Sequence, residues 1–329
     1  MELLPVKQAI ATPVFDPFQY AVELPHEIVL HPLGFQMQLK TNSREIIQAT
    51  EESWGGFPAL FTDKSIELRV AVSDDRQAPC PSTLVWRAQR NLLTLISDQN
   101  NFAICDLHTG FAFSWLSPAT ARSHDFFRYY YLDTIVQVLL WQTHLTRVHA
   151  SCVARNGRGV LLCGASGAGK SCLAYACARR GWSFITDEST ALVRGSSERM
   201  ALGKPRQMHF RETAAGILPE LDGRLAAPNA VGKISIEVHT ADLPAIQTAF
   251  QCRIASVVFL NRQAGAPAHL VPISAQDAFD RLDSDLPLFE EPVHEEHRAS
   301  LRNVLQAGAF ELRYSGLDEA VNALEPLVR

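Results

Sequence analysis

The sequence contains no long hydrophobic run and no excess of positive charge. No stretch among the 329 residues approaches the roughly 18 apolar residues of a membrane span. The first residues also lack the basic-then-apolar pattern of a secretory signal. Lysine and arginine number 30 against 35 aspartates and glutamates, a formal net charge of −5. A mildly acidic chain is not suited to coat nucleic acid or an anionic membrane, so we expect neither among its partners.

Cysteine is also used sparingly. The chain has seven cysteines, an odd number, and no Cys-x-x-Cys pair. This usage argues against a disulfide framework and against a structural zinc site. We interpret Cys163, Cys172 and Cys177 as small buried hydrophobic residues in a reducing compartment, and we expect a cytoplasmic protein.

What the chain does contain is ordinary globular material. Hydrophobic residues make up 47% and charged residues 20%, which is enough for a real core. The length favours two domains, at about 150 residues each. Residues 1–120 read as a smaller α+β module of unknown role, and residues 121–329 as a second domain. Alternating or apolar runs predict strands in the first module, and 3.6-residue spacing predicts a helix after it. These runs are 65–72, 92–97, 102–107 and 110–114 for the strands and 126–143 for the helix.

The most specific signal is a complete G-x-x-x-x-G-K-[ST] phosphate loop, the Walker A pattern. An apolar strand precedes it at 159–163 and a helical run follows it to residue 180. Strand, glycine loop and helix place a helix N-terminus and inward-facing amides under bound phosphates. The lysine adds a positive charge, and the serine hydroxyl is a magnesium ligand. The loop residues are Gly164, Ala165, Ser166, Gly167, Ala168, Gly169, Lys170 and Ser171.

A hairpin signal just upstream brings a histidine to this loop. Asn156-Gly157 lies between two strand-like runs and predicts a two-residue type I′ turn. That turn pairs Arg155 with Arg158, so the residue numbers of any two partners in the antiparallel hairpin add up to 313. His149 would therefore lie opposite Gly164. Two interpretations stay open: the histidine acts on the phosphates, or it only supports the loop.

Two acidic residues, Asp187 and Glu188, follow the next predicted strand, at 182–186. Carboxylates at the end of a strand beside a phosphate loop are typical magnesium ligands and general bases. A solvated turn is the alternative. Three later cations, Lys204, Arg206 and Arg211, would be phosphate or substrate contacts, although a solvated basic stretch is the more ordinary interpretation for each.

Near the C-terminus, the segment 294–297 reads His-Glu-Glu-His. Its i, i+3 spacing lacks the geometry of a zinc helix, and we interpret it as surface charge.

Taken in order, these pieces resemble the catalytic domain of HPr kinase/phosphorylase and its relatives, including lasso peptide kinases. The shared elements are a hairpin led by His149, the phosphate loop, a helix ending in Arg180-Gly181, and a strand closing on Asp187-Glu188. The match covers residues 149–188. A looser similarity in apolar pattern continues to the C-terminus, and residues 1–120 show none.

The resemblance implies an α/β P-loop kinase domain with a phosphoenolpyruvate carboxykinase-like fold, preceded by the smaller α+β module. It implies ATP as donor, Mg²⁺ as cofactor, and a serine hydroxyl as acceptor. Asp187 would be the general base, Ser171 and Glu188 metal ligands, and His149 part of the catalytic set. Glu188 stands where the bifunctional enzymes have a second aspartate, and their later glycine-rich signature loop is missing. The resemblance therefore implies the kinase direction and does not extend to the phosphorylase reaction.

These observations together favour an ATP-dependent kinase acting on a serine of a peptide or small protein. A small-molecule kinase of the same fold is an alternative, as is a non-catalytic module in which ATP gates a partner. Asp187 separates either kinase from the non-catalytic module, because a kinase needs a base at that position and a pure binder does not. The sequence leaves open whether the chain forms a homo-oligomer.

Overall fold

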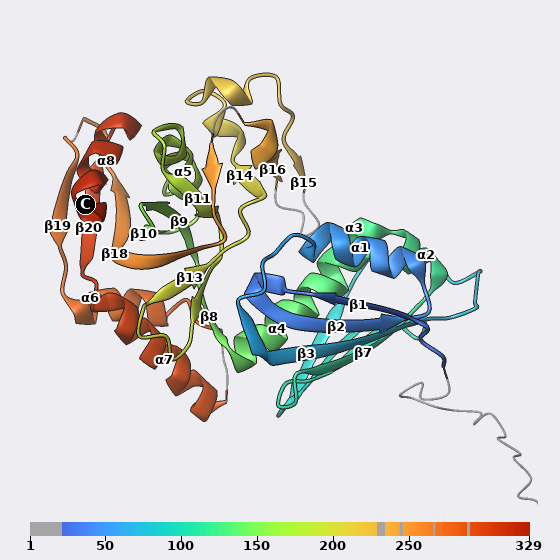
Figure 1. The fold of residues 1–329 in the computed structure, drawn as a ribbon. Coiled ribbons are helices and arrows are strands. Elements are labelled where there is room, and N and C mark those ends of the chain that lie inside the picture. Colours follow the sequence, from blue (N-terminus) through green and yellow to red (C-terminus); the bar gives the residue numbers. More distant parts are fainter. Residues whose placement is uncertain (1–21, 229–233, 244–245, 266, 288–289) are drawn as a thin grey trace, which may run out of the picture. The chain divides into compact units, whose positions relative to one another are not determined.

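The computed structural model describes residues 22–228, 234–243, 246–265, 267–287 and 290–329. The chain forms two compact units, Met1–Val136 and Gln137–Arg329 (Figure 1). Each unit combines a large sheet with helices, which confirms the expected mixed α/β class.

The first unit is built on a seven-stranded sheet in the order β1-β2-β3-β7-β6-β5-β4. Every second side chain of β2 is buried, including Phe35, Met37 and Leu39, so one face of the sheet forms the core. Ile46 and Trp54 of helix α1 are buried as well. The strands are β1 (His26–Leu30), β2 (Phe35–Thr41), β3 (Phe61–Val72), β4 (Val85–Gln89), β5 (Leu92–Asp98), β6 (Asn101–Asp106) and β7 (Phe111–Leu116). The helices are α1 (Arg44–Trp54), α2 (Pro118–Arg122) and α3 (His124–Phe126), followed by a π-helical segment, Phe127–Leu132.

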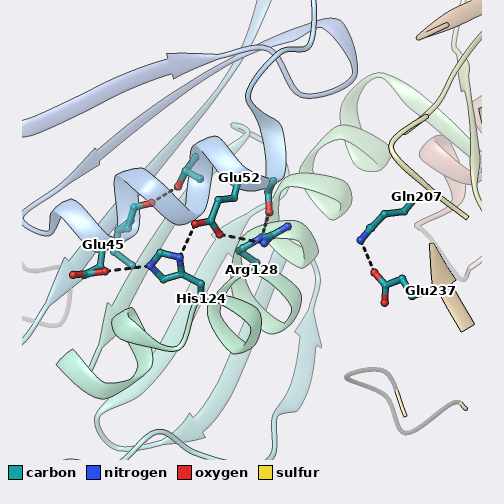
Figure 2. Close-up of polar contacts among 9 residues, drawn as sticks. Glu45, Glu52, His124, Arg128, Gln207 and Glu237 are labelled. Atoms are coloured by element: carbon teal, nitrogen blue, oxygen red, sulfur yellow. Dashed lines mark hydrogen bonds and ion pairs between the residues drawn. The ribbon is translucent and has the colours of Figure 1, made fainter. Parts of the chain in front are cut away.

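Charged contacts join α3 and the π-helical segment to α1. Figure 2 shows His124 between two carboxylates of α1, with Nδ1 2.9 Å from Glu52 and Nε2 3.2 Å from Glu45. Arg128 also bonds Glu52, at 3.2 Å. Burial lowers the pKa of His124, but the hydrogen bonds to Glu52 and Glu45 outweigh it and raise that pKa overall. His124 and Arg128 therefore tie α3 and the π-helical segment to α1.

These contacts explain where the two units divide. Helix α4 (Asp133–Thr143) contains the boundary, at Val136, whereas the sequence placed it at residue 120. Residues 121–132 belong with the first unit because α2, α3 and the π-helical segment all contact α1. The single helix expected at 126–143 is interrupted in the same region by the π-helical turn.

The second unit is built on a ten-stranded sheet, of which eight strands follow the order β17-β11-β9-β10-β18-β13-β12-β8. Strand β20 pairs in parallel with the last half of β18, and β19 pairs with β20. The strands are β8 (Leu145–Val148), β9 (Ala150–Arg155), β10 (Arg158–Cys163), β11 (Ser183–Thr186), β12 (Thr190–Val193), β13 (Met200–Leu202), β17 (Gln247–Thr248), β18 (Gln251–Arg262), β19 (His269–Pro272) and β20 (Ala309–Tyr314).

Helices cover this sheet through two hydrophobic clusters. Strand residues such as Val160 and Leu162 join the cluster that contains α5 (Lys170–Arg179) and α8 (Leu317–Leu324). Their neighbour Leu161 joins the cluster of α6 (Ala275–Asp283) and α7 (Glu291–Leu305). Because successive strand side chains point to opposite faces, the loop-bearing strand β10 is buried on both sides.

A small three-stranded sheet, in the order β14-β16-β15, completes this unit. Its strands are β14 (Gln207–Phe210), β15 (Ala227–Pro228) and β16 (Ile234–His239). Gln207 donates to Glu237 across β14 and β16 (Figure 2). Met208 and Phe210 are buried in the cluster that holds α5, which places the C-terminal end of β14 beside the phosphate loop.

The interpretation of segment 294–297 as surface charge is wrong for His297. Its side chain is 0% exposed, and its Nδ1 lies 3.0 Å from the Thr146 hydroxyl. Helix α7 begins at Glu291, with Pro292 in its first turn, where proline is tolerated. His297 therefore lies within the helix, on the same buried face as Leu301 and Val304.

Candidate functional site

The phosphate loop lies between β10 and α5, as the sequence predicts. Gly164, Gly167 and Gly169 have φ values of +152°, +91° and +97°, and residues other than glycine rarely adopt this backbone conformation. Two of them also leave room for neighbours: the Arg211 guanidinium lies against Gly167, and the Tyr314 hydroxyl lies against Gly169. The loop therefore needs glycine for its backbone shape and for close packing.

A pocket opens over this loop. Residues from the loop, from the acidic turn after β11, and from β14 and the segment that follows it all contribute. The pocket is lined by His149, Ser166, Gly167, Gly169, Lys170, Ser171, Cys172, Glu188, His209, Phe210, Arg211, Thr213, Ala214, Ile217, Ser235 and Arg262. Cys172 is therefore a partly exposed pocket residue, whereas Cys163 and Cys177 are buried as expected.

Lys170 points back into the loop. Its ammonium lies 2.6 Å from the Gly164 carbonyl, 3.3 Å from the Ala165 carbonyl and 3.2 Å from Nε2 of His149. Its side chain is only 7% exposed. A buried ammonium needs such acceptors, and these contacts hold the charge where phosphate oxygens would bind.

His149 lies against the loop because the predicted hairpin register is correct. Arg158 pairs with Arg155 and Cys163 with Ala150, so the next pair is Gly164 with His149. An ammonium only donates, so Nε2 of His149 accepts from Lys170 and Nδ1 donates to the Glu188 carbonyl, at 3.0 Å. Burial, followed by the charges of Lys170 and Arg147, lowers the pKa of His149 and keeps the ring neutral. His149 thus connects the phosphate loop to the acidic turn.

Asp187 is the buried carboxylate of the site, at 3% exposure. The His209 backbone N–H donates to Oδ2 at 2.7 Å, and the Ser151 hydroxyl lies 3.2 Å from Oδ1. Burial raises the pKa of Asp187, while hydrogen bonds from Ser171 and from the His209 backbone oppose that rise. The bond from Ser171 places Asp187 directly beside the last residue of the loop.

Glu188 lies on the pocket side of the same turn. It lines the pocket and is partly exposed. The structure thus brings all the loop residues, His149, Asp187 and Glu188 together, although they come from three separate stretches of the sequence.

The oxygen donors here suit a magnesium ion bound together with phosphates. Ser171 and Glu188, which both line the pocket, supply one hydroxyl and one carboxylate, the ligand types that Mg²⁺ prefers. No cluster of three or more His, Cys, Asp or Glu in the described part of the chain forms a complete metal cage. A site that relies on substrate phosphates for further ligands is typical of Mg²⁺.

Sequence reasoning undervalued three residues. Arg211 bonds the Ser166 hydroxyl at 2.9 Å and lines the pocket, whereas Lys204 and Arg206 do not line it. His209 and Ser151, which hold Asp187, carry no motif. Strand β14 brings Arg211 and His209 to the loop from about 40 residues away, and no local pattern indicates that approach.

The parallel strands β18 and β20 support the loop from one side. Tyr314, at the end of β20, donates to the Ala168 carbonyl at 3.2 Å. Arg262 ends β18 and lines the pocket, so a cation stands where many α/β sites place a carboxylate. Among the residues that line the described pocket the acidic one is Glu188, and Asp187 lies buried beside it in the chain.

Comparison with known proteins does not assign the chain to a family. No family model matches the chain, and no curated protein matches its sequence. Among solved structures, the Hpr(Ser) kinase/phosphatase from Coxiella burnetii matches 55% of this chain and 88% of its own, with 12% identity and a TM-score of 0.29. A TM-score this low is insufficient to establish a common fold. No helix within the described residues is both long enough and apolar enough to span a membrane.

Proposed function

We propose that the protein is an ATP-dependent kinase that transfers the γ-phosphoryl group to a serine hydroxyl of a peptide or small protein. One observation carries the proposal: a phosphate loop with a buried lysine ends at Ser171, and Ser171 bonds a buried carboxylate, Asp187. A phosphate-binding module alone needs the loop and has no need of a buried carboxylate beside it.

The donor would bind along the loop. The loop amides and the α5 N-terminus face the phosphates, Lys170 supplies a positive charge, and Arg211 lies across the loop at Ser166. Magnesium held by Ser171 and Glu188 with the phosphates would neutralise charge that develops on the phosphate oxygens. His149 keeps Lys170 and the acidic turn in a fixed relation.

Asp187 would accept the proton of the acceptor hydroxyl. In that step the serine oxygen forms a bond to the γ-phosphorus, the bond from phosphorus to the bridging oxygen breaks, and ADP leaves. The serine proton passes to the Asp187 carboxylate. A loose phosphoryl-transfer transition state requires this proton transfer only late, so a carboxylate is basic enough.

The choice of a polypeptide acceptor rests on the first unit and on the family resemblance. A separate seven-stranded unit of this size is more in keeping with a macromolecular partner than with a metabolite. If the protein instead transfers the phosphoryl group to a metabolite, the choice of a polypeptide acceptor is wrong.

Single-turnover transfer from γ-labelled ATP tests the proposal. The parent protein is mixed with magnesium and with peptides encoded beside its gene, and the labelled residue is identified by mass spectrometry. We expect label on serine. Label on a small molecule would indicate a metabolite kinase, and tight ATP binding with no transfer to any cellular protein, peptide or metabolite would support the binding-module alternative.

A further inference from the structure

Ser151 is a polar residue in an otherwise apolar stretch of a buried strand. It is 0% exposed, as are its neighbours Ala150, Cys152 and Val153 in β9. Burying a hydroxyl costs free energy unless it is hydrogen-bonded. Its partners therefore show what the hydroxyl does here, and both belong to Asp187.

The hydroxyl donates to the Asp187 backbone carbonyl and lies 3.2 Å from Oδ1 of the same residue. It has one proton, so it serves one of these oxygens at a time. The His209 N–H holds the other carboxylate oxygen, Oδ2. Ser151 thus lies against the main chain and one carboxylate oxygen of Asp187, and the His209 N–H holds the other carboxylate oxygen.

A bulge in β11 produces this arrangement. At the start of the strand, Ser183 pairs with Ala154 and Phe184 with Val153, but Thr186 pairs with Cys152. Ile185 is the extra residue, so the register moves by one position. Without that shift Ser151 would lie opposite Thr186; with it, the residue opposite Ser151 is Asp187. Bulges of this kind re-aim a side chain at a site.

We propose that Ser151 is the positioning residue that holds Asp187 in the orientation needed to accept the acceptor-hydroxyl proton. The inference rests on the proposed kinase function. A carboxylate that turns or shifts by about 1 Å loses roughly 10²-fold in rate, so removing its anchor should reduce turnover and leave the nucleotide loop intact.

The test compares Ser151→Ala with a matched variant, Thr190→Val. Thr190 is also 0% exposed, and its hydroxyl donates to the Ala150 carbonyl at 2.9 Å, away from the pocket. Both variants lose one buried hydroxyl. We expect kcat to fall about 10- to 100-fold in S151A, with ATP affinity within about twofold of the parent, and kcat to stay at the parent value in T190V.

A double-mutant cycle with Asp187→Asn separates positioning from a general structural effect. If Ser151 acts through Asp187, S151A should cost little further activity once the base is gone. An equal fold-loss in both backgrounds would overturn the proposal, as would an unchanged kcat in S151A. If S151A does not fold, Ser151→Cys keeps the size with a much weaker donor and is judged by the same cycle.

The two proposals fail differently. A parent protein that transfers no phosphoryl group ends the kinase proposal, and the inference about Ser151 falls with it. A parent that transfers normally, with S151A equal to it, overturns the role of Ser151 alone.

Discussion

The ammonium of Lys170 lies 3.2 Å from Nε2 of His149, and the opposite ring nitrogen of His149 bonds the Glu188 carbonyl. One neutral imidazole therefore connects the Lys170 ammonium to the acidic turn. This arrangement depends on the register of the β9–β10 hairpin, because His149 directly precedes β9 and the loop that ends at Lys170 and Ser171 directly follows β10.

Replacing Lys170 by alanine should weaken ATP binding by about 1–3 kcal/mol, because a charge-assisted contact to the phosphates is lost. Isothermal titration calorimetry with ATP and magnesium measures the change. Lys204→Ala is the matched control, since Lys204 does not line the pocket. Equal affinity in K170A and the parent would show that the loop does not bind nucleotide.

Replacing Asp187 by asparagine should leave ATP affinity nearly unchanged and reduce transfer by roughly 10²–10⁴-fold, because the shape stays and the base is lost. Quench-flow measurement of a single turnover tests this. Glu188→Gln, in the adjoining pocket residue, is the comparison. If E188Q is the more damaging change, Glu188 is the base and the assignment to Asp187 is wrong.

Arg211 offers a second test of the pocket. Arg211→Ala removes the guanidinium that bonds Ser166 and lies against Gly167. We expect ATP affinity to fall by about 3- to 10-fold, in keeping with one exposed charged contact. Arg206→Ala, which changes a cation outside the pocket, should have no effect. Equal losses in the two variants would indicate a general charge effect in place of a specific contact.

Gly159 tests the packing of β10, the strand that leads to the loop. A Cβ atom at this position in β10 would overlap Sγ of Cys252 and lie 3.2 Å from Ile254. We expect Gly159→Ala to lower the free energy of unfolding by about 1–3 kcal/mol, the usual cost of overpacking a core. Urea denaturation measures it. Gly216→Ala, whose nearest atom would be 3.8 Å away, should be close to neutral. Adding Cys252→Ala to G159A should recover part of the loss, and a lack of recovery would contradict the assigned clash.

The buried His297 should make stability depend on pH. Burial, with the charges of Arg194 and His294, lowers its pKa to about 3, against a usual value of 6.5. As the pH falls, the unfolded state therefore takes up the proton at a higher pH than the folded state does. The contribution of His297 to stability is complete above pH 6.5 and declines as the pH falls from 6.5 towards 3. At pH 5 this loss is about 2 kcal/mol.

His297→Gln removes that titration. Unfolding free energies at pH 7.5 and pH 5 should differ less in H297Q than in the parent, and the comparison within each variant cancels any general loss of stability. The same difference in both proteins would show that His297 is not held neutral in the fold.

Local sequence patterns were sufficient for the loop and its immediate surroundings. Gly164 to Ser171, the Asn156-Gly157 turn and the position of His149 all depend on residues close in the chain. A two-residue turn determines every pair in its hairpin, so arithmetic on residue numbers placed His149 correctly. The strand before Asp187 was equally visible as a short apolar run.

What holds Asp187 was decided only by the tertiary structure. Ser151 reaches it because one extra residue in β11 changes the register between strands about 30 residues apart, and His209 reaches it from the separate sheet of β14. The same limit applies to His297, whose burial depends on where α7 begins and packs. A sequence pattern reports which residues prefer a strand or a helix, but contacts between distant segments depend on how registers, bulges and helix ends fit together, and these are settled by packing.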